Sequence, residues 1–109
     1  MEQMRHAEER GAVLRTLAQD YEREMTSVRS LAGALDLQGY PLSDQSLQFH
    51  LTYLSQENYV QIWRAKDTAA WRRDRGFQGS GDNIVFAKLL VRGLHLLDGR
   101  IGEDPGVRF

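Results

Sequence analysis

The sequence predicts a mainly helical domain with a small β-hairpin. Three segments repeat apolar residues at the spacing of an amphipathic helix, and a strand, a long polar loop and a return strand follow them. A further apolar segment, from Leu90 to Asp98, predicts one more helix, which Gly99 ends. Helix, helix-turn-helix and hairpin form the element order of a winged helix-turn-helix, in which the hairpin is the wing. We therefore expect this fold, with an extended wing and an additional C-terminal helix.

Apolar periodicity and capping residues define the first two predicted helices. The first helix spans about residues 6–24, and its apolar face consists of Ala7, Leu14, Leu17, Ala18 and Tyr21. The second helix begins near Thr26 or Ser27, either of which can cap it. Its apolar positions recur at i, i+3, i+4 and i+7, and they are Val28, Leu31, Ala32 and Leu35. Gly39 can end this helix in a left-handed conformation.

The third predicted helix, residues 43–57, is the segment on which the fold hypothesis rests. Ser43 stands where an N-cap is needed, and Asp44 suits the positive end of the helix dipole. A β-branched and aromatic run follows at residues 59–63 and predicts the first strand of the hairpin. The expected core consists of Leu47, Leu51 and Leu54 from this helix, packed against Val28, Leu31, Leu35 and Val60.

The segment between the two predicted strands is long, basic and rich in glycine. It carries Arg72, Arg73 and Arg75 beside Trp71, followed by a Gly- and Ser-rich run. The return strand is predicted at residues 84–87. Residues 1–100 then form one winged helix domain with a wing loop at about 66–83. Residues 101–109 contain a proline and two glycines, and we expect a loosely held tail there.

Composition narrows the classes of function. The 109-residue chain has no cysteine, which excludes disulfides and thiolate metal sites. It has no apolar run of the kind found in signal peptides or membrane spans, so we expect a cytoplasmic protein. The three histidines lie apart in the sequence, and His50 is expected to be a half-buried packing residue rather than a ligand. No nucleophile motif or acidic pair stands out, so we expect neither an enzyme, a metal site nor a cofactor.

Several motifs resemble the winged helices of ArsR-type regulators. They are Ser-Val-Arg-Ser-Leu-Ala-Gly-Ala-Leu at residues 27–35, Leu-Ser at 42–43, His-Leu-Thr-Tyr-Leu at 50–54 and Tyr-Val at 59–60. The whole chain, including Arg-Gly-Leu at 92–94 and Asp-Pro-Gly-Val at 104–107, resembles small ArsR-like proteins of Mu-like phages and prophages. This resemblance covers most of the chain. It implies a winged helix, a DNA-binding role, pairing through the terminal helices and a bacterial host cell.

Two features depart from the ArsR pattern. The Trp- and Arg-rich loop is longer than a usual wing, and the Cys or His clusters of ArsR metal sensors are absent from this sequence. Metal sensing is therefore not implied by the resemblance. The expectation carried over is limited to the fold and to DNA binding.

Binding to double-stranded DNA would use the outer side of the third helix and the wing. Glutamine can pair with the major-groove edge of adenine, and Phe or a Thr methyl can touch a thymine methyl. The expected DNA-binding residues are Arg29, Ser43, Gln45, Gln48, Phe49, Thr52, Arg72, Arg73 and Arg75. The third helix has no Lys or Arg and two acids, and the formal net charge of the chain is −1. Neutralisation of phosphates must therefore come from Arg29 and the wing arginines.

Two functions from different classes follow from these residues. One is a sequence-specific DNA-binding regulator of phage type. The other is a winged helix that contacts a protein partner through Phe49 and Tyr53 without binding DNA. Polar residues of the third helix and the wing also have a simpler interpretation, as a solvated face and a solvated loop. The salt dependence of DNA binding discriminates between the two functions.

The terminal helices predict a homodimer. In the last helix Leu90, Leu94 and Leu97 form a complete stripe that faces the core. The other apolar residues of this helix then lie outside the stripe, where one core cannot readily bury them. The first helix has a similar surplus beside its apolar face. The expected dimer contacts are Val13, Val91 and Leu96.

Overall fold

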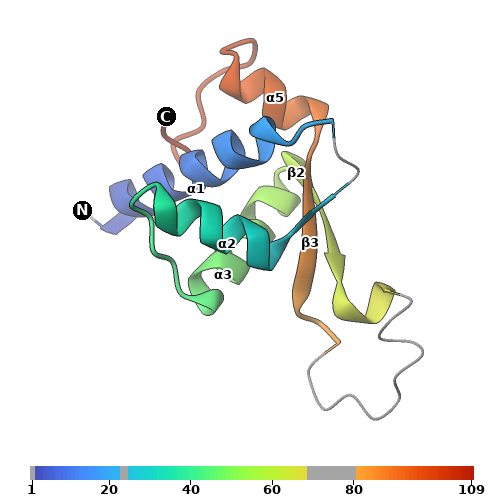
Figure 1. The fold of residues 1–109 in the computed structure, drawn as a ribbon. Helices are drawn as coiled ribbons and strands as arrows, with labels where there is room; N and C mark the ends of the chain where they lie inside the picture. The colour runs from blue at the N-terminus through green and yellow to red at the C-terminus, as the bar shows by residue number, and fades with distance from the viewer. Residues whose placement is uncertain (1, 23–24, 69–80) are drawn as a thin grey trace.

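The computed structural model describes residues 2–22, 25–68 and 81–109 (Figure 1). The helices of this described part are α1 (Glu2–Gln19), α2 (Val28–Leu37), α3 (Asp44–Gln56), α5 (Val91–Leu97) and the short 3-10 helix η1 (Ala65–Asp67). The strands are β1 (Thr26–Ser27), β2 (Val60–Arg64) and β3 (Ile84–Leu89), which form one antiparallel sheet in the order β1-β3-β2. The fold is therefore mainly helical with a small sheet, as the sequence predicts.

The predicted helix starts and stops are confirmed in α2 and α3. Ser27 caps α2 by accepting a hydrogen bond from the backbone N–H of Ser30 at 3.1 Å. Ser43 caps α3 in the same way, accepting from the N–H of Ser46 at 3.1 Å. Gly39 follows α2 at a φ of +89°, a left-handed conformation that glycine adopts without steric cost. Short-range chemistry thus sets these boundaries.

The sheet has one strand more than the predicted hairpin. Thr26 and Ser27 pair with Ala87 and Phe86 of β3, so a third strand lies on the edge opposite β2. A two-residue strand shows no period-two pattern, and its partners lie some sixty positions away in the chain, so only tertiary pairing reveals it. Helix α1 also ends at Gln19, earlier than predicted.

The predicted core is confirmed. The three leucines of α3 lie in one buried cluster with all four of their expected partners, Val28, Leu31, Leu35 and Val60. Helix α1 adds Val13, Leu14 and Leu17, and the inner face of the sheet adds Ile84, Ala87 and Leu89. The helices α1, α2 and α3 therefore share one core with the sheet, which lies along one side of them (Figure 1).

The prediction for the last helix is correct for Leu94 and Leu97, which pack against the core, and wrong for Leu96. Gly93 and Leu96 are the buried residues of α5, while Leu90, Leu94 and Leu97 are only partly buried. Gly93 lies so close to the carbonyl of Tyr59 that a Cβ atom there would overlap it. This close approach of two backbones turns Leu96 toward the core, which residue spacing alone does not determine.

The same rotation corrects the expected dimer contacts. Val13 is completely buried and Leu96 nearly so, both within the core of a single chain. They are therefore not surplus apolar residues available to a second copy. Val91 alone of the expected three is exposed, at 56%. The surplus of apolar residues that the sequence predicted for α1 and α5 is thus reduced, among the three expected contacts, to Val91.

The C-terminal tail is packed rather than loosely held. Val107 is buried, and the N–H of Arg108 donates to the carbonyl of Ala7 in α1 at 2.8 Å. Gly11 of α1 allows this contact, because a Cβ atom at that position would overlap the carbonyl of Arg108. Proline and glycine here shape a specific turn instead of marking a free end. None of the described helices is long and apolar enough to cross a membrane.

Candidate nucleic-acid interface

The outer stripe of α3 is the surface that the sequence assigns to base contacts. Gln45, Phe49 and Gln56 are exposed along it, and Thr52 is partly buried. Phe49 is 56% exposed, the largest apolar group on this helix that reaches solvent. The opposite side of α3 is buried in the core. The helix thus presents one polar stripe with a single aromatic side chain in its middle.

Gln48 has a different role from the one predicted. Its side-chain amide donates to the carbonyl of Ile84 and accepts from the N–H of Ile84, both at 2.8 Å. The amide therefore pairs with the first residue of β3 as another strand would, and it is not free to contact a base. Sequence reasoning missed this because glutamine at a partly buried helix position looks the same as an exposed one.

This two-bond contact fixes the hairpin against α3. Ile84 is also the residue opposite Arg64, at the end of the hairpin that leads into residues 69–80. The N-terminal half of α3 and that end of the hairpin therefore lie next to each other, in the lower half of Figure 1. The exposed stripe of α3 and the strand ends that flank residues 69–80 are thus neighbouring parts of the molecule.

The remaining candidate residues of the helices are placed as follows. The hydroxyl of Ser43 serves the cap of α3 and also donates to Ser46 Oγ at 3.0 Å. The hydroxyl of Thr52 donates to the carbonyl of Gln48 one turn earlier, at 2.8 Å. Arg29 is exposed in the first turn of α2. Among the predicted base-reading residues, Gln45 and Phe49 therefore have the most accessible side chains.

Positive charge near the hairpin is partly neutralised. Lys66 Nζ lies 3.0 Å from Asp82 Oδ1, and this hydrogen bond lowers the pKa of the Asp82 carboxyl. The guanidinium of Arg64 donates to the backbone carbonyl of Asp82 at 2.6 Å. The predicted phosphate contacts Arg72, Arg73 and Arg75 lie outside the described residues. Together with Arg29, those arginines are the cations that the sequence offers for contact with phosphates.

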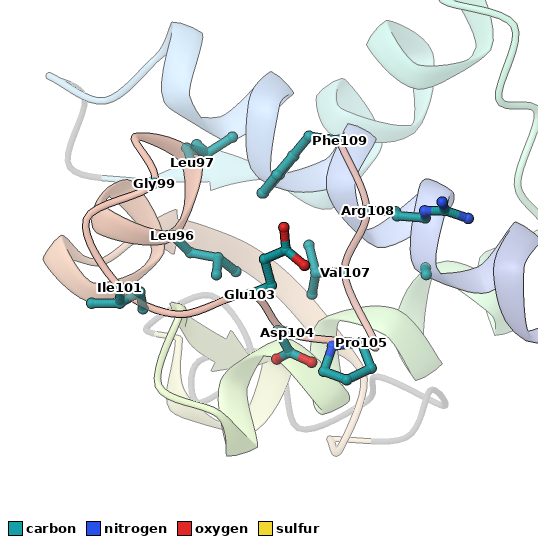
Figure 2. A pocket seen from close by; sticks show the side chains of 11 residues that line it. Leu96, Leu97, Gly99, Ile101, Glu103, Asp104, Pro105, Val107, Arg108 and Phe109 are labelled. Carbon is teal, nitrogen blue, oxygen red and sulfur yellow. The ribbon is translucent and has the colours of Figure 1, made fainter.

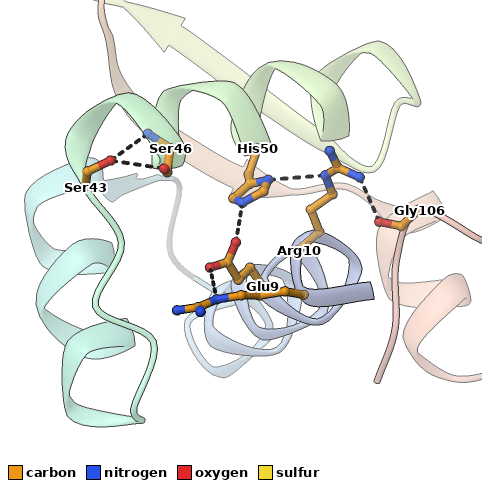
Figure 3. A network of polar contacts seen from close by, with 7 residues as sticks. Glu9, Arg10, Ser43, Ser46, His50 and Gly106 are labelled. Carbon is orange, nitrogen blue, oxygen red and sulfur yellow. Dashed lines mark hydrogen bonds and ion pairs between the residues drawn. The ribbon is translucent and has the colours of Figure 1, made fainter. Parts of the chain in front are cut away.

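A buried polar network joins α3 to α1 and to the C-terminal tail, where the sequence predicted only apolar packing. His50 is 1% exposed, and its Nε2 lies 3.0 Å from Glu9 Oε1 of α1. Its Nδ1 accepts from Arg10 Nε at 3.2 Å, and Arg10 also donates to the carbonyl of Gly106 at 3.1 Å (Figure 3). Burial, followed by the charge of Arg10, holds the pKa of His50 below its usual value despite the opposing hydrogen bond to Glu9. The prediction of a half-buried packing residue is therefore wrong.

Arg10 also covers the tyrosine that was expected to face a protein partner. Its guanidinium lies 3.9 Å from the centre of the Tyr53 ring and 5.5 Å from that of Phe49. The hydroxyl of Tyr53 donates to Asp104 of the tail at 3.2 Å. Tyr53 is thus partly buried and bonded within the chain, which corrects its assignment to an open contact surface. Phe49 remains accessible.

One signal in the sequence points to this network. Glu9 and Arg10 lie one turn before Val13 and Leu14, on positions that the helical period directs toward the core. Charged residues at core positions are nearly always paired. Their partners His50 and Gly106 are distant in sequence, so only the folded chain identifies them.

The tail, α1 and α5 also enclose an open hollow of about 930 Å³ (Figure 2). Leu96, Val107 and Phe109 contribute apolar walls, and the carboxylate of Glu103 points between them. The residues that line the hollow come from α1, α5 and the tail, so it is separate from the stripe of α3. The described residues hold no group of three or more His, Cys, Asp or Glu side chains suited to a metal ion.

Comparison with known proteins does not assign this chain to a family. No family model matches it, and searches of curated proteins and of solved structures gave no significant match. The function of α3 and the hairpin is therefore inferred from the residues and geometry of this chain.

Proposed function

We propose that the chain is a winged helix-turn-helix protein that binds double-stranded DNA, with α3 in the major groove and the basic hairpin on the backbone. The observation that carries this proposal is the pair of hydrogen bonds between Gln48 and Ile84. It holds the root of the basic loop beside the exposed stripe of α3. A recognition helix and a wing need this adjacency if they are to contact the same stretch of duplex.

The dimensions and side chains of α3 suit a groove. Its 13 residues extend over roughly 20 Å at 1.5 Å per residue. Gln45 can form two hydrogen bonds with adenine, and Phe49 can pack on a thymine methyl. We assign the sequence preference to these two residues. Ser43 and Arg29 lie at the starts of α3 and α2, where backbone N–H groups favour phosphate.

Affinity then depends on the arginines of the long loop. Helix α3 has no Lys or Arg, its first residue is Asp44, and Glu57 is its C-cap. Counterion release makes DNA affinity fall with salt by a slope of about 0.9 for each phosphate neutralised. A small slope carried mainly by Arg72, Arg73 and Arg75 is the expected signature.

The test is a titration against phage genomic fragments at two salt concentrations. Combined Arg→Ala changes at 72, 73 and 75 should weaken binding equally for all sequences and reduce the salt slope by about 0.9 for each phosphate that is no longer neutralised. Arg100→Ala removes an exposed charge just after α5 and serves as the control. An unchanged slope in the triple variant would exclude the loop from the interface.

Contact with a protein is the second candidate function, and the exposure of Phe49 favours it. An aromatic side chain that is 56% exposed on a helix without cations suits a protein surface as well as a base. Under this alternative, DNA binding is weak and nearly independent of salt, and Phe49→Ala abolishes capture of the partner.

We also propose that the protein acts as a homodimer in the cytoplasm of a bacterial host. Two copies of α3 about 34 Å apart would match one turn of DNA. Of the three expected contact residues only Val91 is accessible, so the test variant is Val91→Glu. Sedimentation at micromolar concentration should show a dimer that this change dissociates, and a monomer for both proteins would refute the dimer.

A further inference from the structure

We propose that Glu9, His50 and Arg10 form a pH-sensitive latch that holds the C-terminal tail against α1 and α3. This inference goes beyond the proposed DNA binding and does not depend on it. The latch joins three segments that are far apart in sequence, because Arg10 bonds both to His50 of α3 and to Gly106 of the tail (Figure 3). Its three side chains are all buried.

The hydrogen bonds require one form of the His50 ring. Arg10 Nε can only donate, so Nδ1 of His50 must be an acceptor without a proton. Nε2 then carries the ring proton and donates it to the carboxylate of Glu9. The neutral imidazole with its proton on Nε2 is the form that satisfies both partners. A second proton on Nδ1 removes the acceptor on which Arg10 depends.

Protonation also places two cations in contact. The groups that face His50 are Glu9, Arg10 and His6 of α1, and Arg5 lies behind Glu9 at 3.7 Å. Glu9 favours the imidazolium, whereas Arg10 and His6 oppose it. Burial opposes it as well, because the site is closed to water. An imidazolium therefore forms only when Arg10 withdraws from Nδ1.

Withdrawal of Arg10 weakens the tail at its turn. The same guanidinium donates to the carbonyl of Gly106 and lies over the ring of Tyr53. The adjacent Asp104 accepts from Tyr53 and, at 2.8 Å, from the hydroxyl of Tyr59. The positive charge of Arg10 thus offsets the negative charge of the Asp104 carboxylate, which accepts hydrogen bonds from the two phenols. Once Arg10 leaves, the turn loses the donor to Gly106 and a positive charge that interacts with Asp104.

The direction of the pH effect follows from proton uptake. In the closed state the pKa of His50 is lowered, and in the open state it returns to about 6.5. Opening therefore takes up a proton, and lower pH favours it. If the closed state stays neutral, the opening equilibrium increases about tenfold between roughly pH 7.5 and 5.5, from the open-state titration alone.

Amide hydrogen exchange of the whole chain measures this opening. The N–H of Arg108, bonded to the carbonyl of Ala7, reports release of the tail, and the N–H of Leu35 in α2 reports global unfolding. After correction for intrinsic exchange rates, protection of Arg108 should fall about tenfold from roughly pH 7.5 to 5.5 and should stay well below that of Leu35 at each pH, because release of the tail requires less free energy than global unfolding. Equal protection of the two amides would overturn the latch, since Arg108 would then exchange only through global unfolding.

Substituting the three histidines one at a time shows which of them causes the pH dependence. His50→Gln retains a donor and an acceptor but does not titrate, so protection of Arg108 should become independent of pH. His6→Gln and His95→Gln should leave the tenfold change intact. If His50→Gln does not fold, ring titration of the native protein by NMR decides, because the loss of Arg108 protection must follow the ionisation of His50. A loss that persists in His50→Gln, or that follows another histidine, refutes the proposal.

Discussion

Replacing Gln48 by Ala tests whether its side chain joins the hairpin to α3. The change removes a donor and an acceptor that both serve Ile84, each at 2.8 Å in a partly buried position. A typical intramolecular hydrogen bond contributes about 0.5–1.5 kcal/mol net, so two bonds predict a loss of about 1–3 kcal/mol in the free energy of unfolding. The loss should lie in the upper part of this range if the N–H and carbonyl of Ile84 remain without replacement partners.

Gln45→Ala provides the matched control. It makes the same chemical change one turn earlier on the same helix, at an exposed position. Both substitutions gain the same small helix propensity, so the difference between them reports the contact with Ile84. Urea denaturation followed by circular dichroism measures both. Equal stabilities of the two variants would refute the argument, and with it the adjacency on which the proposed interface depends.

Three further outcomes are expected. Leu51→Ala should cost about 2–5 kcal/mol, because Leu51 is completely buried in the central cluster, and a loss below about 1 kcal/mol in thermal unfolding would contradict that placement. Ser43→Ala should cost about 1 kcal/mol through loss of the α3 cap, whereas Ser55→Ala, inside the helix, should cost much less in the same assay. Burial and the hydrogen bond to Asp104 raise the pKa of Tyr59 to about 12, so this phenol stabilises the fold below its ordinary pKa of 10.0 and loses that contribution as pH rises toward 12. Absorbance titration should show a late phenol phase that Asp104→Asn shifts to lower pH, and an unshifted titration would exclude the bond.

The sequence by itself determined the features that depend on neighbouring residues. Helical spacing identified the buried leucines of α3 and their partners in α2, and all of them lie in one core. Local capping chemistry identified Ser27 and Ser43, and the left-handed preference of glycine identified Gly39. These interactions form within about four residues, so their signals survive in a linear pattern.

Only the tertiary structure decided which polar residues are available at the surface. Gln48 and Gln45 are identical side chains on one helix, yet one pairs with the backbone of Ile84 and the other is exposed. The close approach of Gly93 to Tyr59 determines the rotation of α5, and in this rotation Leu96 is buried in the core.

The tail and the buried network show the same limit. Arg10, His50 and Gly106 come from three separate parts of the chain, and their hydrogen bonds span up to 96 positions. Residue spacing encodes which face of a helix is apolar. It does not encode which distant donor meets which acceptor, because that is determined by how the elements pack once the core has formed.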